Sequence, residues 1–163
     1  MKRFTNITYI ISLSLILSSC GYQLRGSSEI VGLDNVRVIS DNRTNISKIL
    51  QQKFSSVNLP DITSVSKYPA IKIINITSNK RQLSVNSSGR VDEYEINKVL
   101  RYQFIFSEKN KINGTIKASA SYDFNESQMQ GTKEREKIAY NNIDRTLVRK
   151  LILRFKSASK SNF

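Results

Sequence analysis

Two long segments in the second half of the chain alternate between apolar and polar residues, and they restrict the fold more than any other feature. In residues 90–107, one face carries Tyr94, Ile96, Leu100, Tyr102, Phe104 and Phe106. The other face carries Glu93, Glu95, Asn97, Arg101 and Gln103, and only Lys98 and Val99 break the pattern. In residues 112–124, the apolar face is made of Ile112, Gly114, Ile116, Ala118, Ala120, Tyr122 and Phe124. A period of two residues predicts β-strands with one apolar and one polar face.

The polar residues 108–111 separate these segments and predict a turn, so the two strands should form an antiparallel hairpin. At about 3.3 Å per residue, a dozen paired residues give a ribbon roughly 40 Å long. A common strand has only about five or six residues. We therefore expect a hairpin that reaches beyond its own core and packs one face against helices.

Shorter signals predict two further strands and a turn. Residues 36–39 predict a first short strand, because Val and Ile follow an Asp-Asn pair. The β-branched residues 71–76 predict a second strand, which runs toward Lys80 and Arg81. The Ser- and Asn-rich residues 83–89 predict a mobile turn.

Two segments have helical periodicity. Thr44 has the chemistry of a helix cap, and the apolar residues after it follow at i, i+3, i+4 and i+8, which predicts a helix over residues 45–55. A second helix is expected from about Thr132, with an apolar side made of Ile138, Tyr140, Ile143, Leu147, Val148, Leu151, Ile152 and Phe155. The sequence thus predicts an α+β fold: a four-stranded mixed sheet with two helices on one face, in the order β-α-β-β-β-α.

The first 20 residues have the parts of an export signal. Lys2 and Arg3 form a positive start, residues 7–17 form an apolar run, and two serines precede Cys20, the only cysteine. The apolar run is shorter than the roughly 20 residues that a membrane-spanning helix needs. Residues 17–20, Leu-Ser-Ser-Cys, resemble the lipobox of bacterial lipoproteins, which implies lipidation of Cys20. An ordinary secretory signal with a cysteine nearby is the alternative.

Charge points to an anionic partner. The 163 residues include 26 basic and 13 acidic side chains. Removal of Lys2 and Arg3 with the signal would leave 24 basic residues against 13 acidic ones, a net charge of +11. Such an excess predicts binding to nucleic acid, an acidic protein surface or a phosphorylated lipid, and an export signal argues against nucleic acid. A generally basic, soluble surface is the simpler alternative.

Catalysis is not expected. The chain has no histidine, so it has no Ser-His or Cys-His nucleophile pair and no imidazole metal ligand. It also has no Gly-rich phosphate loop and no carboxylates at metal-ligand spacing. A Ser-Lys dyad or a pair of acids would be the remaining enzymatic alternatives. We expect no metal and no cofactor beyond covalent lipid on Cys20.

These signals divide the chain into four parts. Residues 1–19 are a lipoprotein signal peptide, and residues 20–33 are the lipidated amino terminus with a linker. Residues 34–155 form a single α+β domain, and residues 156–163 form a polar C-terminal tail that we expect to be disordered.

Three short stretches resemble the LptE family of lipopolysaccharide-assembly lipoproteins. The most specific is Cys-Gly-Tyr-Gln-Leu-Arg-Gly at residues 20–26, followed by Gly-Arg-Val-Asp-Glu-Tyr at residues 89–94 and Leu-Val-Arg-Lys-Leu at residues 147–151. The order of elements and the length are also similar, so the resemblance covers essentially the whole chain. The sequence departs from the family in its polar 84–88 turn and in lacking the usual long C-terminal extension.

The resemblance implies a non-enzymatic lipoprotein anchored in the cell outer membrane at its periplasmic face. It would plug the lumen of the β-barrel LptD, help that barrel to assemble, and assist transfer of lipopolysaccharide to the outer leaflet. The implied partners are an LptD-type outer-membrane β-barrel, lipopolysaccharide, and the membrane through the lipid anchor, with no nucleic acid. A polar strand face suits the polar interior of such a barrel.

Four cations are candidates for contact with lipid A phosphates. Lys80, Arg81 and Arg90 lie nearest the expected turn of the hairpin, and Lys133 lies where the family tends to carry a lysine. Basic groups here would displace the divalent cations that bridge neighbouring lipopolysaccharide molecules, through charge-assisted contacts. A solvated surface charge is the alternative for each of them.

Two other functions are compatible with the sequence. The first is a lipid-anchored periplasmic adaptor of another envelope assembly or secretion complex, which would co-purify with that complex and without LptD. The second is a periplasmic lipid carrier, which would need an enclosed apolar pocket, and the polar strand faces argue against one.

Overall fold

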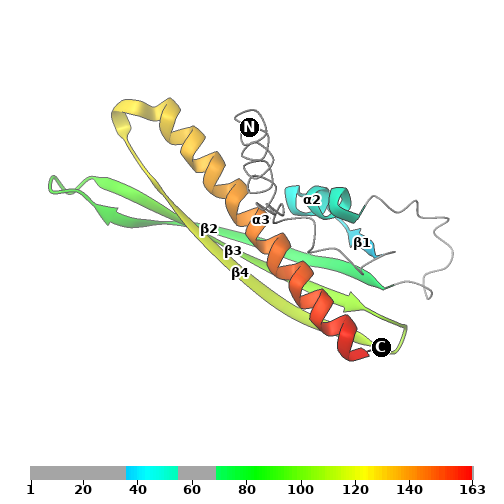
Figure 1. Ribbon diagram of the computed structural model, residues 1–163. Helices are drawn as coiled ribbons and strands as arrows, with labels where there is room; N and C mark the ends of the chain where they lie inside the picture. Colours follow the sequence, from blue (N-terminus) through cyan, green and yellow to red (C-terminus); the bar gives the residue numbers. More distant parts are fainter. Residues whose placement is uncertain (1–35, 55–68, 163) are drawn as a thin grey trace, which may run out of the picture.

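The computed structural model describes residues 36–54 and 69–162 as one sheet with helices against it (Figure 1). The elements are β1 (Arg37–Ser40), α2 (Asn45–Phe54), β2 (Ala70–Val85), β3 (Val91–Ile105), β4 (Lys111–Asp123), the short 3₁₀ helix η1 (Glu126–Gln128) and α3 (Met129–Asn162). The sheet order is β1-β2-β3-β4, with β1 parallel to β2 and the other neighbours antiparallel. The predicted α+β class, the mixed sheet and the order β-α-β-β-β-α are confirmed. The predicted signal peptide and Cys20 lie outside the described residues.

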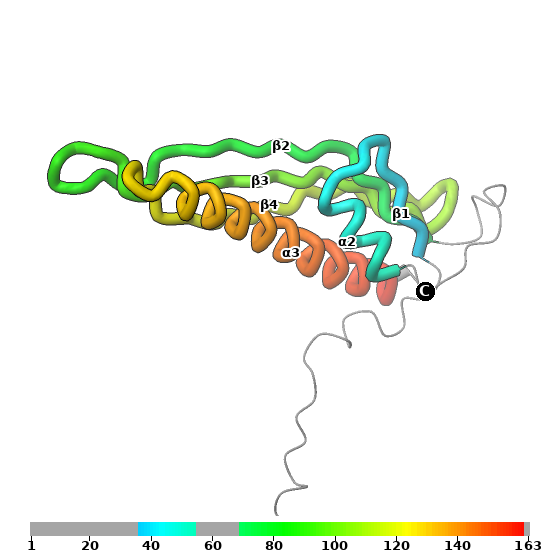
Figure 2. Tube along the Cα trace, turned by 90° about the horizontal axis from the view of Figure 1, so that it is seen from above, coloured from blue at the N-terminus to red at the C-terminus, as the bar shows by residue number. Residues whose placement is uncertain are grey.

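Both helices cover the same face of the sheet (Figure 2). α3 runs along β4 and also contacts β3, while α2 lies beside α3 and against β1. None of the helices in the described part of the chain combines the length and apolar character needed to cross a membrane.

α2 begins where the sequence predicts, because Thr44 and Ser47 cap each other. The Thr44 hydroxyl accepts a hydrogen bond from the Ser47 amide at 3.1 Å, and the Ser47 hydroxyl accepts one from the Thr44 amide at 2.9 Å. These bonds satisfy amides that the first helical turn leaves free. The predicted apolar stripe is confirmed: Ile46, Leu50 and Phe54 are buried.

The core forms between the apolar strand faces and α3. The alternation predicted for β3 and β4 is confirmed, since Ile96, Leu100 and Ile116 are each at most 2% exposed. Phe155 of α3 joins this layer: its ring centroid lies 5.0 Å from that of Phe104 in an edge-on arrangement. Full burial of each such side chain stabilises the fold by about 1.5–3 kcal/mol.

α3 differs from the prediction at both ends. It begins at Met129 rather than about Thr132, directly after η1. Ile138, predicted in the apolar stripe, is 49% exposed, and Ala139 is buried instead, because Ala139, Ile143 and Leu147 follow at i, i+4 and i+8. The helix continues to Asn162, so residues 156–162 are not a separate disordered tail.

β2 is longer than predicted and irregular. It extends to Val85, so the polar turn is shorter than the predicted residues 83–89. Its pairing with β3 shifts between Ile73 and Asn75 and again between Gln82 and Ser84, which marks β-bulges. β1 pairs only with Ala70–Ile73, so in the described part of the chain the rest of β2 has a neighbour on one side only.

Lys98, which breaks the apolar alternation, is explained by a buried ion pair. Its ammonium donates to Asp144 Oδ1 of α3 at 2.6 Å, and the two side chains are 13% and 5% exposed. Asn45 of α2 donates to the other oxygen of Asp144 at 2.8 Å, and the Lys98 ammonium lies 4.9 Å from the centre of the Tyr140 ring. One carboxylate therefore joins β3, α2 and α3.

We expect Asp144→Ala to lower the free energy of unfolding by about 3–5 kcal/mol, because it leaves the buried Lys98 ammonium without a counter-charge. Chemical denaturation of the purified protein measures this. The matched control is Lys98→Met combined with Asp144→Leu, which removes both charges and should cost much less. A loss below about 1 kcal/mol for the single variant would show that the pair behaves like a surface ion pair.

Candidate functional site at the distal end of the sheet

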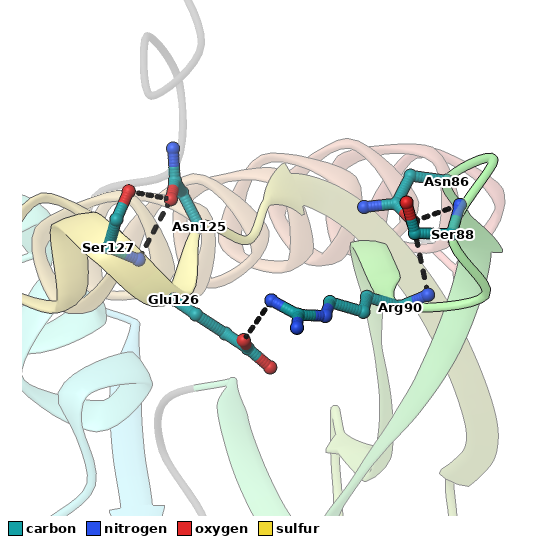
Figure 3. Close-up of polar contacts among 6 residues, drawn as sticks. All are labelled: Asn86, Ser88, Arg90, Asn125, Glu126 and Ser127. Atoms are coloured by element: carbon teal, nitrogen blue, oxygen red, sulfur yellow. Dashed lines mark hydrogen bonds and ion pairs between the residues drawn. The ribbon is translucent and has the colours of Figure 1, made fainter.

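The candidate site lies at the end of the sheet formed by the β2–β3 turn, the β4–η1 junction and the start of α3, which we call the distal end. At the turn, the Asn86 side chain accepts hydrogen bonds from the amides of Ser88 at 3.0 Å and Arg90 at 3.1 Å (Figure 3). Gly89 adopts a φ of 74°, a conformation that favours glycine, which explains the glycine of the 89–94 stretch. The turn is therefore held by its own hydrogen bonds.

The β4–η1 junction is fixed by a second asparagine. The Asn125 side chain accepts hydrogen bonds from the amide of Ser127 at 3.0 Å and from its hydroxyl at 2.7 Å (Figure 3). The buried Thr132 of α3 donates to the Asn125 carbonyl at 3.1 Å and accepts from its amide at 3.0 Å. Capping of this kind sets the direction in which α3 leaves the sheet.

Arg90 connects these two loops. Its guanidinium lies 3.3 Å from the carboxylate of Glu126, as Figure 3 shows. Both side chains are largely exposed, and such pairs contribute about 0–1 kcal/mol. A polar cavity of about 240 Å³ lies between the loops, with Asp92 and Phe124 among its lining residues. The cation is thus positioned at little energetic cost and can exchange its partner for another anion.

Lys80 points to the helix-covered face. Its ammonium donates to Glu136 of α3 at 2.9 Å and to the Tyr122 hydroxyl at 3.5 Å, and it lies 5.1 Å from the centre of the Tyr94 ring. The hydrogen bond to Glu136 raises the pKa of Lys80 above its ordinary value, partial burial opposes the rise, and Tyr122 adds to it. Burial raises the pKa of the Tyr122 hydroxyl.

Arg81, the next residue, points to the opposite face of the sheet. Its Nε donates to Glu95 at 2.6 Å. The pKa of Glu95 is lowered first by a hydrogen bond from the Asn97 side chain, at 2.8 Å, and then by Arg81. The structure therefore separates Arg81 from Lys80, although the two are adjacent in sequence.

Lys133 is the fourth predicted cation. It is exposed on α3, and it has no hydrogen-bond or ion-pair partner among residues 36–54 and 69–162. The structure thus brings Lys80, Arg90 and Lys133 to the distal end, and of these three predicted cations only Lys133 lacks a partner among the described residues. Cys20, predicted to carry lipid, lies outside the described residues. In the same described ranges, no group of three or more Asp, Glu, Cys or His side chains is placed to hold a metal ion.

Sequence reasoning missed the carboxylates that hold these cations. Glu95 was detectable, because a hairpin turn centred on residues 86–90 places it opposite Arg81. Glu126 and Glu136 were not detectable from the sequence, because their positions depend on the direction that α3 takes after β4.

The face of the sheet away from the helices is polar, and we call it the open face. Cross-strand pairing places these residues on it: Lys72, Asn75, Thr77, Asn79, Arg81, Glu95, Asn97, Arg101, Gln103, Asn113, Thr115, Lys117, Ser119 and Ser121. Those on β4 are exposed, and those on the central strand β3 are half-buried except Arg101, which is exposed. Neighbours bond across the strands, as Gln103 does in donating to Asn113 at 2.9 Å. Val99 is an isolated apolar residue among them.

We expect Glu136→Gln to lower the pKa of Lys80, because it removes the main cause of the rise. In the wild type, the stability contributed by this pair is complete below the unfolded lysine pKa of about 10.4 and is lost as the pH rises through the raised folded value. A ¹³C NMR titration of the lysine side chains measures the pKa, with Lys80→Arg for assignment. Glu134→Gln is the matched control, since Glu134 pairs with Lys137. An unchanged Lys80 pKa in Glu136→Gln would contradict this interpretation.

Comparison with known proteins gives a consistent result. The model of the LptE lipopolysaccharide-assembly family matches residues 33–155. Among curated protein sequences, none matches the chain.

Solved structures share the fold at low sequence identity. Rare lipoprotein B of Shewanella oneidensis matches with a TM-score of 0.65 and 13% identity, over 78% of this chain and 96% of that one. An uncharacterised lipoprotein B of Nitrosomonas europaea matches with a TM-score of 0.62 and 20% identity, over 81% and 88%. A minor lipoprotein of Acinetobacter baumannii matches with a TM-score of 0.60 and 14% identity, over 78% and 93%. The family match covers most of the sequence, and the chain belongs to the LptE family of lipopolysaccharide assembly.

Proposed function

We propose that this protein is an outer-membrane lipoprotein that occupies the lumen of an LptD-type β-barrel and presents cations of its distal end to lipopolysaccharide. Family membership supplies the role in lipopolysaccharide assembly. The structural observation that carries the finer proposal is the open face, a polar sheet surface that neither α2 nor α3 covers.

The open face fits a barrel interior. Sheet surfaces buried against a partner domain are usually apolar, but the lumen of a large outer-membrane barrel is polar. Hydroxyl, amide and charged groups on β2, β3 and β4 supply donors and acceptors for such a wall. Exposed Arg101 and Lys117 add charge at the centre of this face, where a carboxylate of the barrel would pair with them.

The distal cations fit phosphate. Lys133 has no partner among the residues that the structure describes, and the surface pairs of Lys80 and Arg90 are each worth only about 0–1 kcal/mol. Replacing a carboxylate partner with a phosphate therefore costs little. A hydrogen bond between a cation and phosphate contributes about 1.5–3 kcal/mol when it forms.

The anchor is proposed from sequence alone. Cys20 ends the Leu-Ser-Ser-Cys stretch at residues 17–20, and lipid on this thiol would hold the domain at the periplasmic face of the outer membrane. Two or more acyl chains give stable attachment, whereas a single chain gives only marginal attachment.

Co-purification tests the barrel partner. A C-terminal tag on the full chain, extracted in mild detergent, should recover a large outer-membrane barrel in equal amounts. We expect Arg101→Glu combined with Lys117→Glu on the open face to reduce barrel recovery about tenfold or more, because like charges then face each other at the wall.

The control for this experiment carries the same change of charge elsewhere. Lys48→Glu combined with Lys109→Glu alters exposed residues outside the open face and should leave barrel recovery unchanged. Recovery of another envelope assembly or secretion complex without a barrel would favour the adaptor function instead.

Lipopolysaccharide binding tests the distal cations. We expect Lys133→Glu to reduce the lipopolysaccharide retained by the tagged protein about tenfold, since it replaces an attractive contact with a repulsive one. Lys109→Glu, at the other end of the sheet, is the control and should bind as the wild type does. Unchanged binding after combined charge reversal at Lys80, Arg81, Arg90 and Lys133, with the fold intact, would remove this proposal.

A further inference from the structure

A groove between α2 and α3 has the character of a separate anion site. Its volume is about 490 Å³. Lys53 of α2 and Arg145 and Arg149 of α3 line it, and among residues 36–54 and 69–162 no acidic side chain does. Ile49 and Val148 supply apolar lining. α2, which forms one side of the groove, lies beside the middle of α3 and away from the β2–β3 turn (Figure 2).

The two arginines differ from several other cations of this molecule, which pair with carboxylates. Lys80, Arg81, Arg90 and Lys98 each pair with a carboxylate. Within the described ranges, Arg145 and Arg149 have no hydrogen-bond or ion-pair partner. They are four residues apart on one helix, a spacing at which like charges disfavour the helix. An anion in the groove would offset that repulsion.

The lining selects a class of ligand. A guanidinium presents a fork of donors that matches phosphate oxygens, so two of them hold a phosphate in a defined orientation. Thr146, in the same lining, adds a hydroxyl. The apolar Ile49 and Val148 suit the carbon skeleton next to such a phosphate. A charged rim with apolar lining favours an amphiphile over a bare ion.

The position of the groove favours a lipid of the membrane to which the protein would be tethered as its ligand. Val36 follows Cys20 by 16 positions. A fully extended chain of that length spans at most roughly 55 Å. α2 follows β1 directly and contacts it, so the groove adjoins the described elements that are nearest to Cys20 in sequence. Phospholipid headgroups are therefore within reach of the groove.

We infer that the groove between α2 and α3 binds the phosphate of an anionic phospholipid headgroup in the leaflet that holds the Cys20 lipid. The choice of leaflet rests on the proposed anchor. The choice of ligand rests on Arg145, Arg149 and Lys53 with their apolar neighbours. Bound lipid would provide a second attachment point and so orient the domain relative to the membrane.

Native mass spectrometry of the full chain in mild detergent tests the inference. Phosphatidylglycerol and phosphatidylcholine are added at equal concentrations, and the bound fraction of each is measured. We expect the wild type to prefer phosphatidylglycerol about tenfold or more, and Arg145→Gln combined with Arg149→Gln to abolish the preference. Lys109→Gln combined with Lys111→Gln removes the same charge at exposed positions outside the groove and should keep it.

Each other outcome overturns the inference. Equal binding of the two lipids, or an unchanged preference in the arginine variant, would show that the groove does not recognise the headgroup. Competition by inorganic phosphate as strong as by phosphatidylglycerol would assign a bare anion site. If lipopolysaccharide displaces phosphatidylglycerol and this displacement requires both arginines, the groove binds lipopolysaccharide. If the arginine variant loses a co-purifying protein but keeps the lipid preference, the groove binds a protein partner.

The result can be separated from the proposed function. The arginine variant leaves the open face and Lys133 unchanged, so barrel recovery and lipopolysaccharide retention should equal those of the wild type. Loss of lipid preference with barrel recovery intact would support the groove alone, and loss of barrel recovery in this variant would overturn its assignment as a lipid site.

Discussion

The fold depends on a sheet that is apolar on one side only. Tyr102, Phe104 and Ile116 all face the helices, so both helices must bury their stripes against the same surface. Phe155 contacts Phe104 edge-on and stacks with Phe106, with ring centroids 5.0 and 5.4 Å apart. Because α2 and α3 share one face, no other described element covers the opposite face, where the polar residues of β2, β3 and β4 lie.

Because α3 is long, it carries cations at two separate places along the sheet. At 1.5 Å per residue, the 34 residues of α3 span roughly 50 Å. The 15 residues of β3 span about the same distance. α3 therefore runs along the sheet: its start, which carries Lys133, follows η1, and its middle brings Arg145 beside α2. One element carries two separate groups of cations.

The local pattern of apolar and polar residues predicted the strands and helices well, because the periodicity of each element does not depend on distant residues. Lys98 shows the limit, since its place on an apolar face depends on Asp144, 46 residues later. The polar residues 156–162 lack an apolar stripe, yet they extend a helix that is already formed, which adds a bond for each residue fixed. The opposite directions of Lys80 and Arg81 follow from strand geometry, whereas the contact with Glu136 required the whole fold.

The short β1 strand leaves an edge of β2 at which a second copy of the protein could add a strand. Because β1 stops opposite Ile73, most of β2 presents backbone donors and acceptors that nothing else in the described chain pairs. A long, flat strand edge of this kind is a template for polymerisation between molecules. The bulges at Ile73–Asn75 and Gln82–Ser84 interrupt the regular spacing, and Lys80 and Arg81 add like charge between them. A second copy would meet mismatched hydrogen-bond spacing along this edge, which disfavours strand pairing between molecules.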